Sequence, residues 1–220
     1  MQGIQQLNDI VSLKESSNLM EFIDAQPWSG RGIPPNPGKS LLSHLLELLR
    51  RTQQYGYLFS FKTRQIESDL GPLPLIFDAI IERLQPFFDS PIDYVTVNEF
   101  EPGQGIMPHV DSLVLDSFNL KLFGPVVVSL SLLSPCIMTL SKKGEPDIQL
   151  LLEPRSILAL SQDKRYEYTH AISKERRECI QGREIERGRR VSIVFRTLAR
   201  KVRKNEIDED QNRQSGTACH

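Results

Sequence analysis

The segment RVSIVFR at residues 190–196 alternates polar and apolar side chains, which is the pattern of a β-strand. The residues that would share its polar face are Arg190, Ser192, Val194 and Arg196. An arginine that points inward between strands needs an anion, because burying an unpaired charge is prohibitively costly. The segment therefore predicts a strand that presents two guanidinium groups to a bound carboxylate. The alternative is an amphipathic edge strand with both arginines in water.

Short strands fill the sequence from about residue 90 onward. The predicted ranges are Tyr94–Phe100, Val126–Leu133, Cys136–Leu140, Ile148–Leu152, Ser156–Leu160, Tyr166–His170 and Val191–Leu198. Such short and closely spaced strands indicate a sandwich or barrel. Helical spacing of apolar residues occurs earlier, at residues 19–23, 41–49 and 75–84, with one further strand expected at Tyr55–Lys62. Helices followed by antiparallel sheets predict an α+β fold.

The domain organisation expected from this pattern is simple. One domain would span residues 1–198, with its strand-rich core at about residues 90–198. The polar tail, residues 199–220, is basic up to Lys204 and acidic from Glu206 to Asp210, and is expected to be disordered.

The sequence HVD at residues 109–111 and the later His170 suggest a metal site. Residues i and i+2 of a strand point the same way, so His109 and Asp111 can face one cavity while Val110 faces away. His170 ends a strand-like run and can arrive from a neighbouring strand. Two histidines and a carboxylate are the facial triad of non-haem Fe(II). The same donors also bind catalytic zinc, which is the chemical rival.

Tyr94–Phe100 predicts a second strand beside the same cavity. Val95 and Val97 would face a core, and Thr96, Asn98 and Phe100 would face the opposite side. Asn98 could hydrogen-bond a cosubstrate there, whereas the alternative is an asparagine that bonds its own backbone near a turn.

Composition restricts the class of protein. The chain has 220 residues, of which 39% are hydrophobic and 25% charged, as in ordinary globular proteins. The sequence contains no run of about 18 apolar residues, so no membrane span is expected. Residues 1–10 lack the features of a secretory signal. The three cysteines show no paired spacing, so a reducing, intracellular setting (nucleus or cytoplasm in a eukaryote) and a buried thiol at Cys136 are expected.

The net charge of −1 excludes a simple polycation, but the charges are unevenly distributed. Residues 174–204 contain twelve basic and four acidic residues, a net charge of +8. This stretch predicts either a nucleic-acid-binding surface or a solvated, mixed-charge loop and helix face.

These motifs together resemble the AlkB-type Fe(II)- and 2-oxoglutarate-dependent dioxygenases. The resemblance covers about residues 18–198 and rests on NEFEPGQGIMPHVD (98–111), LLEPRS (151–156), YTH (168–170) and RVSIVFR (190–196), with QPW (26–28) and YGY (55–57) near the N-terminus. It implies a double-stranded β-helix, or jelly roll, with N-terminal helices buttressing one sheet. The details look closer to eukaryotic homologues than to the bacterial founder of the family.

The resemblance also implies a role for each matching residue. The cofactors would be Fe(II), 2-oxoglutarate and O2. His109, Asp111 and His170 would hold the iron. Arg190 would bind the far carboxylate of 2-oxoglutarate, and Arg196 would lie near the metal-chelating end. The other cosubstrate positions are Asn98, Phe100 and Ser192. Oxidation of a substrate carbon would release succinate and CO2, and an N-linked hydroxymethyl group would then leave as formaldehyde.

Some positions depart from the family pattern. Phe100 replaces the usual tyrosine, which removes a hydroxyl that reaches the cosubstrate and should weaken its binding by about one neutral hydrogen bond, roughly 1 kcal/mol. Leu113 stands where the founding repair enzyme has a second carboxylate near its substrate. Leu115–Gly124 looks like a loop insertion, with Phe118 and Phe123 as candidate walls of the pocket. Tyr55, Tyr57 and Trp28 are the aromatics expected near a substrate base, although at least one of them should belong to the core.

The leading functional hypothesis is oxidative demethylation or hydroxylation of alkylated or modified nucleobases in DNA or RNA by a monomeric enzyme. One alternative is hydroxylation of a transfer-RNA uridine, and another is hydroxylation of a protein side chain. The third is a binding module of the same fold that does not turn over. Salt-dependent binding to single strands would separate nucleic-acid from protein substrates.

Overall fold

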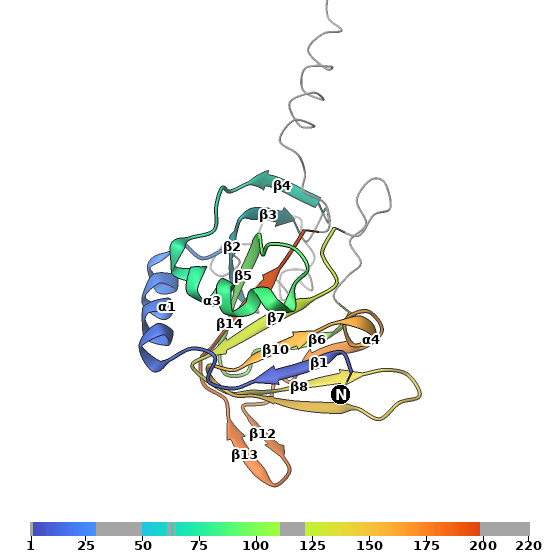
Figure 1. Cartoon of the computed structure of the whole chain (residues 1–220). Coiled ribbons are helices and arrows are strands. Elements are labelled where there is room, and N and C mark those ends of the chain that lie inside the picture. Colours follow the sequence, from blue (N-terminus) through green and yellow to red (C-terminus); the bar gives the residue numbers. More distant parts are fainter. Residues whose placement is uncertain (1, 30–49, 61–62, 64, 111–121, 199–220) are drawn as a thin grey trace, which may run out of the picture.

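The computed structural model describes residues 2–29, 50–60, 63, 65–110 and 122–198. Two antiparallel sheets face each other and form a jelly roll (Figure 1). The six-stranded major sheet has the order β1 (Ile4–Leu7), β10 (Ile157–Leu160), β7 (Val127–Leu132), β14 (Arg190–Arg196), β5 (Tyr94–Phe100) and β2 (Arg51–Tyr55). The four-stranded minor sheet has the order β6 (Ile106–His109), β11 (Thr169–Ile172), β8 (Cys136–Ser141) and β9 (Ile148–Leu152).

Helices α1 (Leu13–Ala25) and α3 (Asp78–Leu84) cover the face of the major sheet that points away from the minor sheet (Figure 1). α1 begins with a capping box, in which Ser12 accepts from the backbone of Glu15 while the Glu15 side chain accepts from the backbone of Ser12. Short 3-10 turns, η1 (Leu75–Phe77) and η2 (Gln85–Phe87), flank α3. The apolar helical face predicted at residues 75–84 is confirmed only in part, because Ile80 and Leu84 are buried but Leu75 is 84% exposed and Ala79 is also exposed. No helix in the described ranges is long and apolar enough to cross a membrane.

The largest cluster of buried side chains lies between these helices and the major sheet. It joins Leu19 and Ile23 of α1 and Ile80 of α3 to Val97 of β5 and Ile193 of β14. These strand residues lie on the faces predicted to be apolar. A second cluster, which includes Cys136, Leu140 and Leu158, fills part of the space between the two sheets.

Three predicted elements were wrong in their limits. Tyr55–Lys62 is not one strand, because Gly56 (φ +83°) separates β2 from β3 (Tyr57–Ser60), which pairs with β4 (Gln65–Asp69). Tyr166–His170 is not a continuous strand, because α4 (Gln162–Tyr166) precedes β11. Part of the region read as a loop and helix face, residues 174–189, instead forms a hairpin of β12 (Arg177–Ile180) and β13 (Arg183–Glu186). The helix predicted at residues 41–49 and the tail lie outside the described residues.

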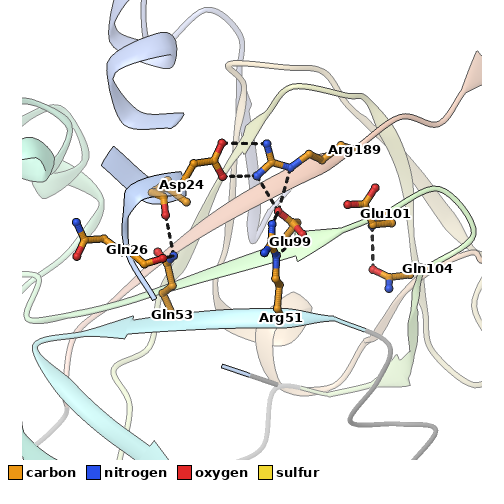
Figure 2. Close-up of polar contacts among 9 residues, drawn as sticks. Asp24, Gln26, Arg51, Gln53, Glu99, Glu101, Gln104 and Arg189 are labelled. Carbon is orange, nitrogen blue, oxygen red and sulfur yellow. Dashed lines mark hydrogen bonds and ion pairs between the residues drawn. The ribbon is translucent and has the colours of Figure 1, made fainter. Parts of the chain in front are cut away.

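A charged network joins α1 to β2, to β5 and to Arg189, the residue just before β14 (Figure 2). The Glu99 carboxylate accepts from Arg51 at 2.6 and 2.8 Å and from Arg189 at 2.7 and 2.9 Å. Arg189 also donates to both carboxylate oxygens of Asp24. The Glu99 side chain is 1% exposed, whereas both arginines keep about a third of theirs in water. Burial alone would raise the pKa of Glu99, but the hydrogen bonds from Arg51 and Arg189 outweigh it and hold that pKa below its ordinary value.

Replacing Glu99 with glutamine should lower the free energy of unfolding at pH 7 by about 2–3 kcal/mol. Breaking a buried pair costs more, but here the two arginines remain partly solvated. Because the folded pKa is depressed, the contribution of Glu99 is complete above its unfolded pKa of about 4.3 and is lost as pH falls through the folded value. Urea unfolding should therefore show a difference between wild type and Glu99→Gln that narrows in acid. The exposed Glu82→Gln should show neither effect, and a difference independent of pH would contradict the ionic origin.

Candidate active site

A cavity of about 370 Å³ lies between the two sheets. The polar side chains that line it are Arg50, Thr96, Asn98, His109, Ser129, His170, Arg190, Ser192 and Arg196. Apolar side chains of both sheets, among them Phe100, Met138, Leu158 and Ile172, complete the wall. The residues of β5 and β14 that line the cavity are the ones that strand alternation assigned to the polar faces of these strands.

His109 and His170 lie side by side in the minor sheet. They are directly paired across β6 and β11, and their ring centroids are 4.1 Å apart with an interplanar angle of 55°. His109 Nδ1 lies 2.9 Å from the carbonyl oxygen of Met107. With the proton on Nδ1 donated to that carbonyl, Nε2 is the nitrogen that would present a lone pair to a metal.

The third predicted metal ligand, Asp111, lies outside the described residues, as do Leu113 and Phe118. Within the described ranges, no three histidine, cysteine, aspartate or glutamate side chains gather into a metal-binding group. The paired imidazoles thus supply two donors on one side of the cavity and require a third from elsewhere.

Arg190 is the largest fully buried side chain of the described chain, at 1% exposure. Its Nη2 donates to Ser131 Oγ at 2.8 Å, and its guanidinium carbon lies 5.7 Å from the centre of the Phe100 ring. Its Nε has no hydrogen-bond partner, and no carboxylate of the described residues forms an ion pair with it. A buried cation without an anion is costly, so this wall of the cavity suits a negatively charged ligand.

The remaining predicted cosubstrate residues lie along the same wall. Ser192 and Asn98 are directly paired across β14 and β5 and both line the cavity. Arg196 lies two strand rows further on, and its guanidinium carbon is 5.8 Å from the Phe123 ring. Phe123 itself stacks on Tyr94 at 5.4 Å rather than lining the cavity.

Sequence reasoning missed Arg50, which also lines the cavity. It directly precedes β2, and that strand was not predicted because residues 50–54 combine only polar side chains. The described lining residues therefore include three arginines, Arg50, Arg190 and Arg196, and no carboxylate.

The aromatic residues predicted near the substrate do not line the described part of the cavity. Tyr55 packs edge-on against Phe77 at 5.4 Å in the helix-side core, and burial raises its pKa to about 12. Trp28 packs against the same core, and the guanidinium carbon of Arg51 lies 4.6 Å from the centre of its ring. Tyr57 of β3 packs beside a separate cluster formed by Phe59, Tyr94, Leu122 and Leu198. None of these three lines the cavity of the described chain.

Replacing Tyr55 with phenylalanine should therefore leave turnover unchanged and lower stability by about 1 kcal/mol. Its hydroxyl donates to Gln53 Oε1 at 2.7 Å, and Gln53 is buried, so the expected loss is one partly buried hydrogen bond. Chemical unfolding and steady-state turnover would be measured on the same preparation. If turnover were lost while stability stayed unchanged, the result would instead support a role for Tyr55 in substrate binding.

The basic stretch from residue 174 does not form a uniform positive surface in its described part. Arg187 and Arg190 are buried, and Arg189 is committed to Asp24 and Glu99. On the hairpin, Arg183 pairs with Glu153 and Arg177 lies 4.0 Å from Glu186. The described part of this segment therefore carries mixed charge, with some of its arginines buried or paired and others exposed on the hairpin. Residues 200–204 lie outside the described ranges. Cys136 is a buried free thiol, as expected.

Comparisons with known proteins agree with this architecture. The sequence profile of the 2OG-Fe(II) oxygenase superfamily matches residues 3–196. An "Alkylated DNA repair protein ALKBH8 homolog" of Arabidopsis thaliana is 31% identical, over 89% of this chain and 58% of that protein. A mitochondrial "Alpha-ketoglutarate-dependent dioxygenase alkB homolog 7" of Bos taurus is 37% identical over 54% of each chain. The chain thus spans little more than half the length of these relatives.

Solved structures agree on the fold. The structure of OsALKBH1 superposes with a TM-score of 0.60 at 13% identity, covering 89% of this chain and 96% of the other. A prolyl hydroxylase from Trichoplax adhaerens gives a TM-score of 0.54 at 10% identity, covering 89% and 83%. The predicted jelly roll is therefore confirmed. Members of the superfamily are oxidoreductases that use Fe(II), 2-oxoglutarate and O2. The chain belongs to the 2OG-Fe(II) oxygenase superfamily and, within it, to the AlkB-type family.

Proposed function

We propose that this chain is an Fe(II)- and 2-oxoglutarate-dependent dioxygenase that demethylates or hydroxylates a modified nucleobase in DNA or RNA. The observation that carries the proposal is the position of Arg190, which is buried and forms no ion pair within the described residues, in the same cavity as the His109–His170 pair. An enzyme that uses 2-oxoglutarate needs a cationic group that binds its carboxylate and side chains that bind the metal. Each feature alone would be less specific evidence for this chemistry than the two together.

The described residues fit both absent groups. His109 and His170, with Asp111 as the predicted third donor, would hold Fe(II). Arg190 would take the far carboxylate of 2-oxoglutarate, with Asn98, Ser192 and Arg196 along its length. When bound, the iron and 2-oxoglutarate activate O2 for insertion into a substrate C–H bond.

The protein's own contribution is orientation and shelter. Ser131 holds the Arg190 guanidinium at 2.8 Å, and Phe100 packs beside it without offering a competing acceptor. Leu158 of the major sheet and Met138 and Ile172 of the minor sheet line the cavity with apolar side chains, and such surroundings strengthen the attraction between Arg190 and a carboxylate.

Nucleobases are the favoured substrates because of the relatives' described activities. One relative is described as an alkylated-DNA repair protein homologue, and others as tRNA (carboxymethyluridine(34)-5-O)-methyltransferases, for instance one of Mus musculus that is 27% identical over 90% of this chain and 31% of that protein. Hydroxylation of a modified tRNA uridine is therefore the second candidate. A base in either substrate would have to leave its stack to reach a cavity between two sheets.

An anaerobic titration of the metal-free protein with Fe(II) and 2-oxoglutarate tests the cofactor half of the proposal. We expect a visible charge-transfer band from the chelate, followed by succinate release when O2 is admitted. Methylated single-stranded DNA and RNA, and uridine-modified tRNA, would then be compared for coupled turnover, with a proline-containing peptide as the protein alternative. A folded protein that gives no band would overturn the oxygenase assignment. A band without coupled turnover on any nucleic acid would overturn only the substrate class.

A further inference from the structure

The pairing of His109 with His170 depends on the register of β6 against β11, and β6 is poorly suited to hold that register alone. It is an edge strand of four residues that, among the described strands, pairs only with β11. Pro108 has no N–H to give to the ladder, and the pairing shifts between the His170 and Ile172 rows. A slip of one residue would turn the His109 side chain to the opposite face of the sheet.

A buried arginine ties the two strands together just beyond their paired rows. The Arg187 side chain is 1% exposed. Its Nη2 donates to the carbonyl oxygen of Gln104 at 3.0 Å, and its Nη1 donates to that of Ser173 at 2.8 Å. Gln104 lies two residues before β6, and Ser173 is the first residue after β11. Because the two strands are antiparallel, these carbonyls belong to the same end of the pair, and one guanidinium bridges them.

Glu178 extends this connection to a third strand. Its side chain is 7% exposed, and its Oε2 lies 3.6 Å from Arg187 Nη1. The same oxygen accepts from the backbone N–H of Ile137 at 3.1 Å, and Ile137 belongs to β8, the other neighbour of β11. Neither Arg187 nor Glu178 is among the described residues that line the cavity. The pair therefore tethers one end of β6, β11 and β8 from outside the ligand site.

Close packing at Gly105 shows that this junction is where the register of β6 is set. A Cβ at this position would lie 2.3 Å from the carbonyl oxygen of Ile172 and 2.6 Å from that of Ser173. The chain thus enters β6 in direct contact with the end of β11. The hydrogen bonds from Arg187 hold the residues on both sides of this contact.

We propose that Arg187 is a positioning residue for the metal site, which keeps β6 in register against β11 so that His109 stays opposite His170. The inference rests on the proposed function, since it concerns the two histidines assigned there to the metal. Hydrogen bonds from a charged donor are roughly twice as strong as neutral ones, so the two from Arg187 add substantially to the few ladder bonds of a short edge strand. A purely structural arginine would stabilise the domain without acting on β6 in particular.

The test compares wild type, Arg187→Met and Glu178→Gln by isothermal titration with Mn(II) in the absence of O2. Arg187→Met removes both donors and keeps a similar volume, so it should bind Mn(II) about 10–100-fold more weakly, the range for groups that orient a metal ligand. Glu178→Gln removes the ion pair but keeps both donors of Arg187 and an acceptor for the Ile137 N–H. It should lose thermal stability and keep nearly the affinity of wild type. Arg183→Met, at an exposed position of the same hairpin, is the matched control.

Hydrogen–deuterium exchange of the metal-free proteins gives a readout that does not involve the metal. The amides of residues 105–109, measured relative to those of β14 in the same protein, should exchange faster in Arg187→Met than in wild type or Glu178→Gln. Arg187→Lys offers one nitrogen in place of the two that reach Gln104 and Ser173, so its affinity and exchange should fall between those of wild type and Arg187→Met.

The outcomes separate this inference from the proposed function. Wild-type Mn(II) affinity in Arg187→Met, or an equal loss in Arg187→Met and Glu178→Gln, would refute the role of Arg187 and leave the dioxygenase assignment intact. If Arg187→Met does not fold, Arg187→Lys decides, and wild-type affinity and exchange in that variant would refute the inference. Absence of Mn(II) binding by wild type would overturn both the inference and the proposed function.

Discussion

Replacing His170 with alanine should remove the Fe(II)–2-oxoglutarate chelate band and all coupled turnover. His170 and His109 are adjacent across two strands, and the remaining imidazole cannot hold the metal as a pair does. Changes to groups that merely orient a ligand cost about 10–100-fold in metal affinity, so loss of a ligand itself should cost more than about 100-fold. Anaerobic titration followed by visible absorbance measures this directly.

The fold should survive this change, because His170 is only half-buried and its strand keeps both neighbours, β6 and β8. Thermal unfolding of the metal-free variant should match that of wild type. Met107→Ala on β6 is the matched control, since it removes an exposed side chain but keeps the carbonyl that faces His109 Nδ1. A chelate band of normal intensity in His170→Ala would remove this residue from the metal site.

Replacing Arg190 with methionine should weaken 2-oxoglutarate binding by about 100-fold or more and leave metal binding nearly unchanged. A charge-assisted, forked pair between guanidinium and carboxylate is among the stronger hydrogen-bonded contacts, and here it would form away from bulk water. Methionine fills similar volume without charge. Because Arg190 is buried and no carboxylate of the described residues pairs with it, the variant should unfold at an equal or higher temperature before ligand is added.

Two further variants sharpen this prediction. Arg190→Lys keeps the charge but loses the fork, so its affinity for 2-oxoglutarate should fall between those of wild type and Arg190→Met. Arg177→Met, on the exposed β12–β13 hairpin, should leave affinity unchanged. Equal 2-oxoglutarate affinity in wild type and Arg190→Met would show that the cosubstrate lies elsewhere. A large drop in metal affinity alone would instead place Arg190 in support of the histidines.

Strand alternation was the most reliable guide to this site. The predicted limits of Tyr94–Phe100 match β5, and the residues assigned to its polar face line the cavity. The residues assigned to the polar face of β14, Arg190, Ser192, Val194 and Arg196, also line the cavity, although that strand was predicted at Val191–Leu198 and runs from Arg190 to Arg196. Both strands lie in the middle of the major sheet, where each face has one environment along its whole length. A period of two in the sequence therefore translates directly into position.

Prediction failed where the environment changes within a few residues. At Gly56 the chain leaves the major sheet, and a Cβ there would lie 2.1 Å from the Asp93 carbonyl oxygen, yet the flanking tyrosines resemble a continuous strand. The charges of residues 174–196 were equally misleading. Arg189 donates hydrogen bonds to Asp24, which is 165 residues away in the sequence, and no local sequence pattern predicts such a partner.

The burial of the Arg190 guanidinium beside the cavity, with no ion pair to the described residues, has a consequence for the lifetime of the protein. A ligand that binds only the folded state at 100 times its dissociation constant adds about 2.7 kcal/mol to the free energy of unfolding. Opening of the chain, and hence its exposure to proteases, should then decrease as the supply of 2-oxoglutarate rises and increase as it falls. Metabolic state would in this way govern how much of the protein persists, independently of any regulation of its synthesis.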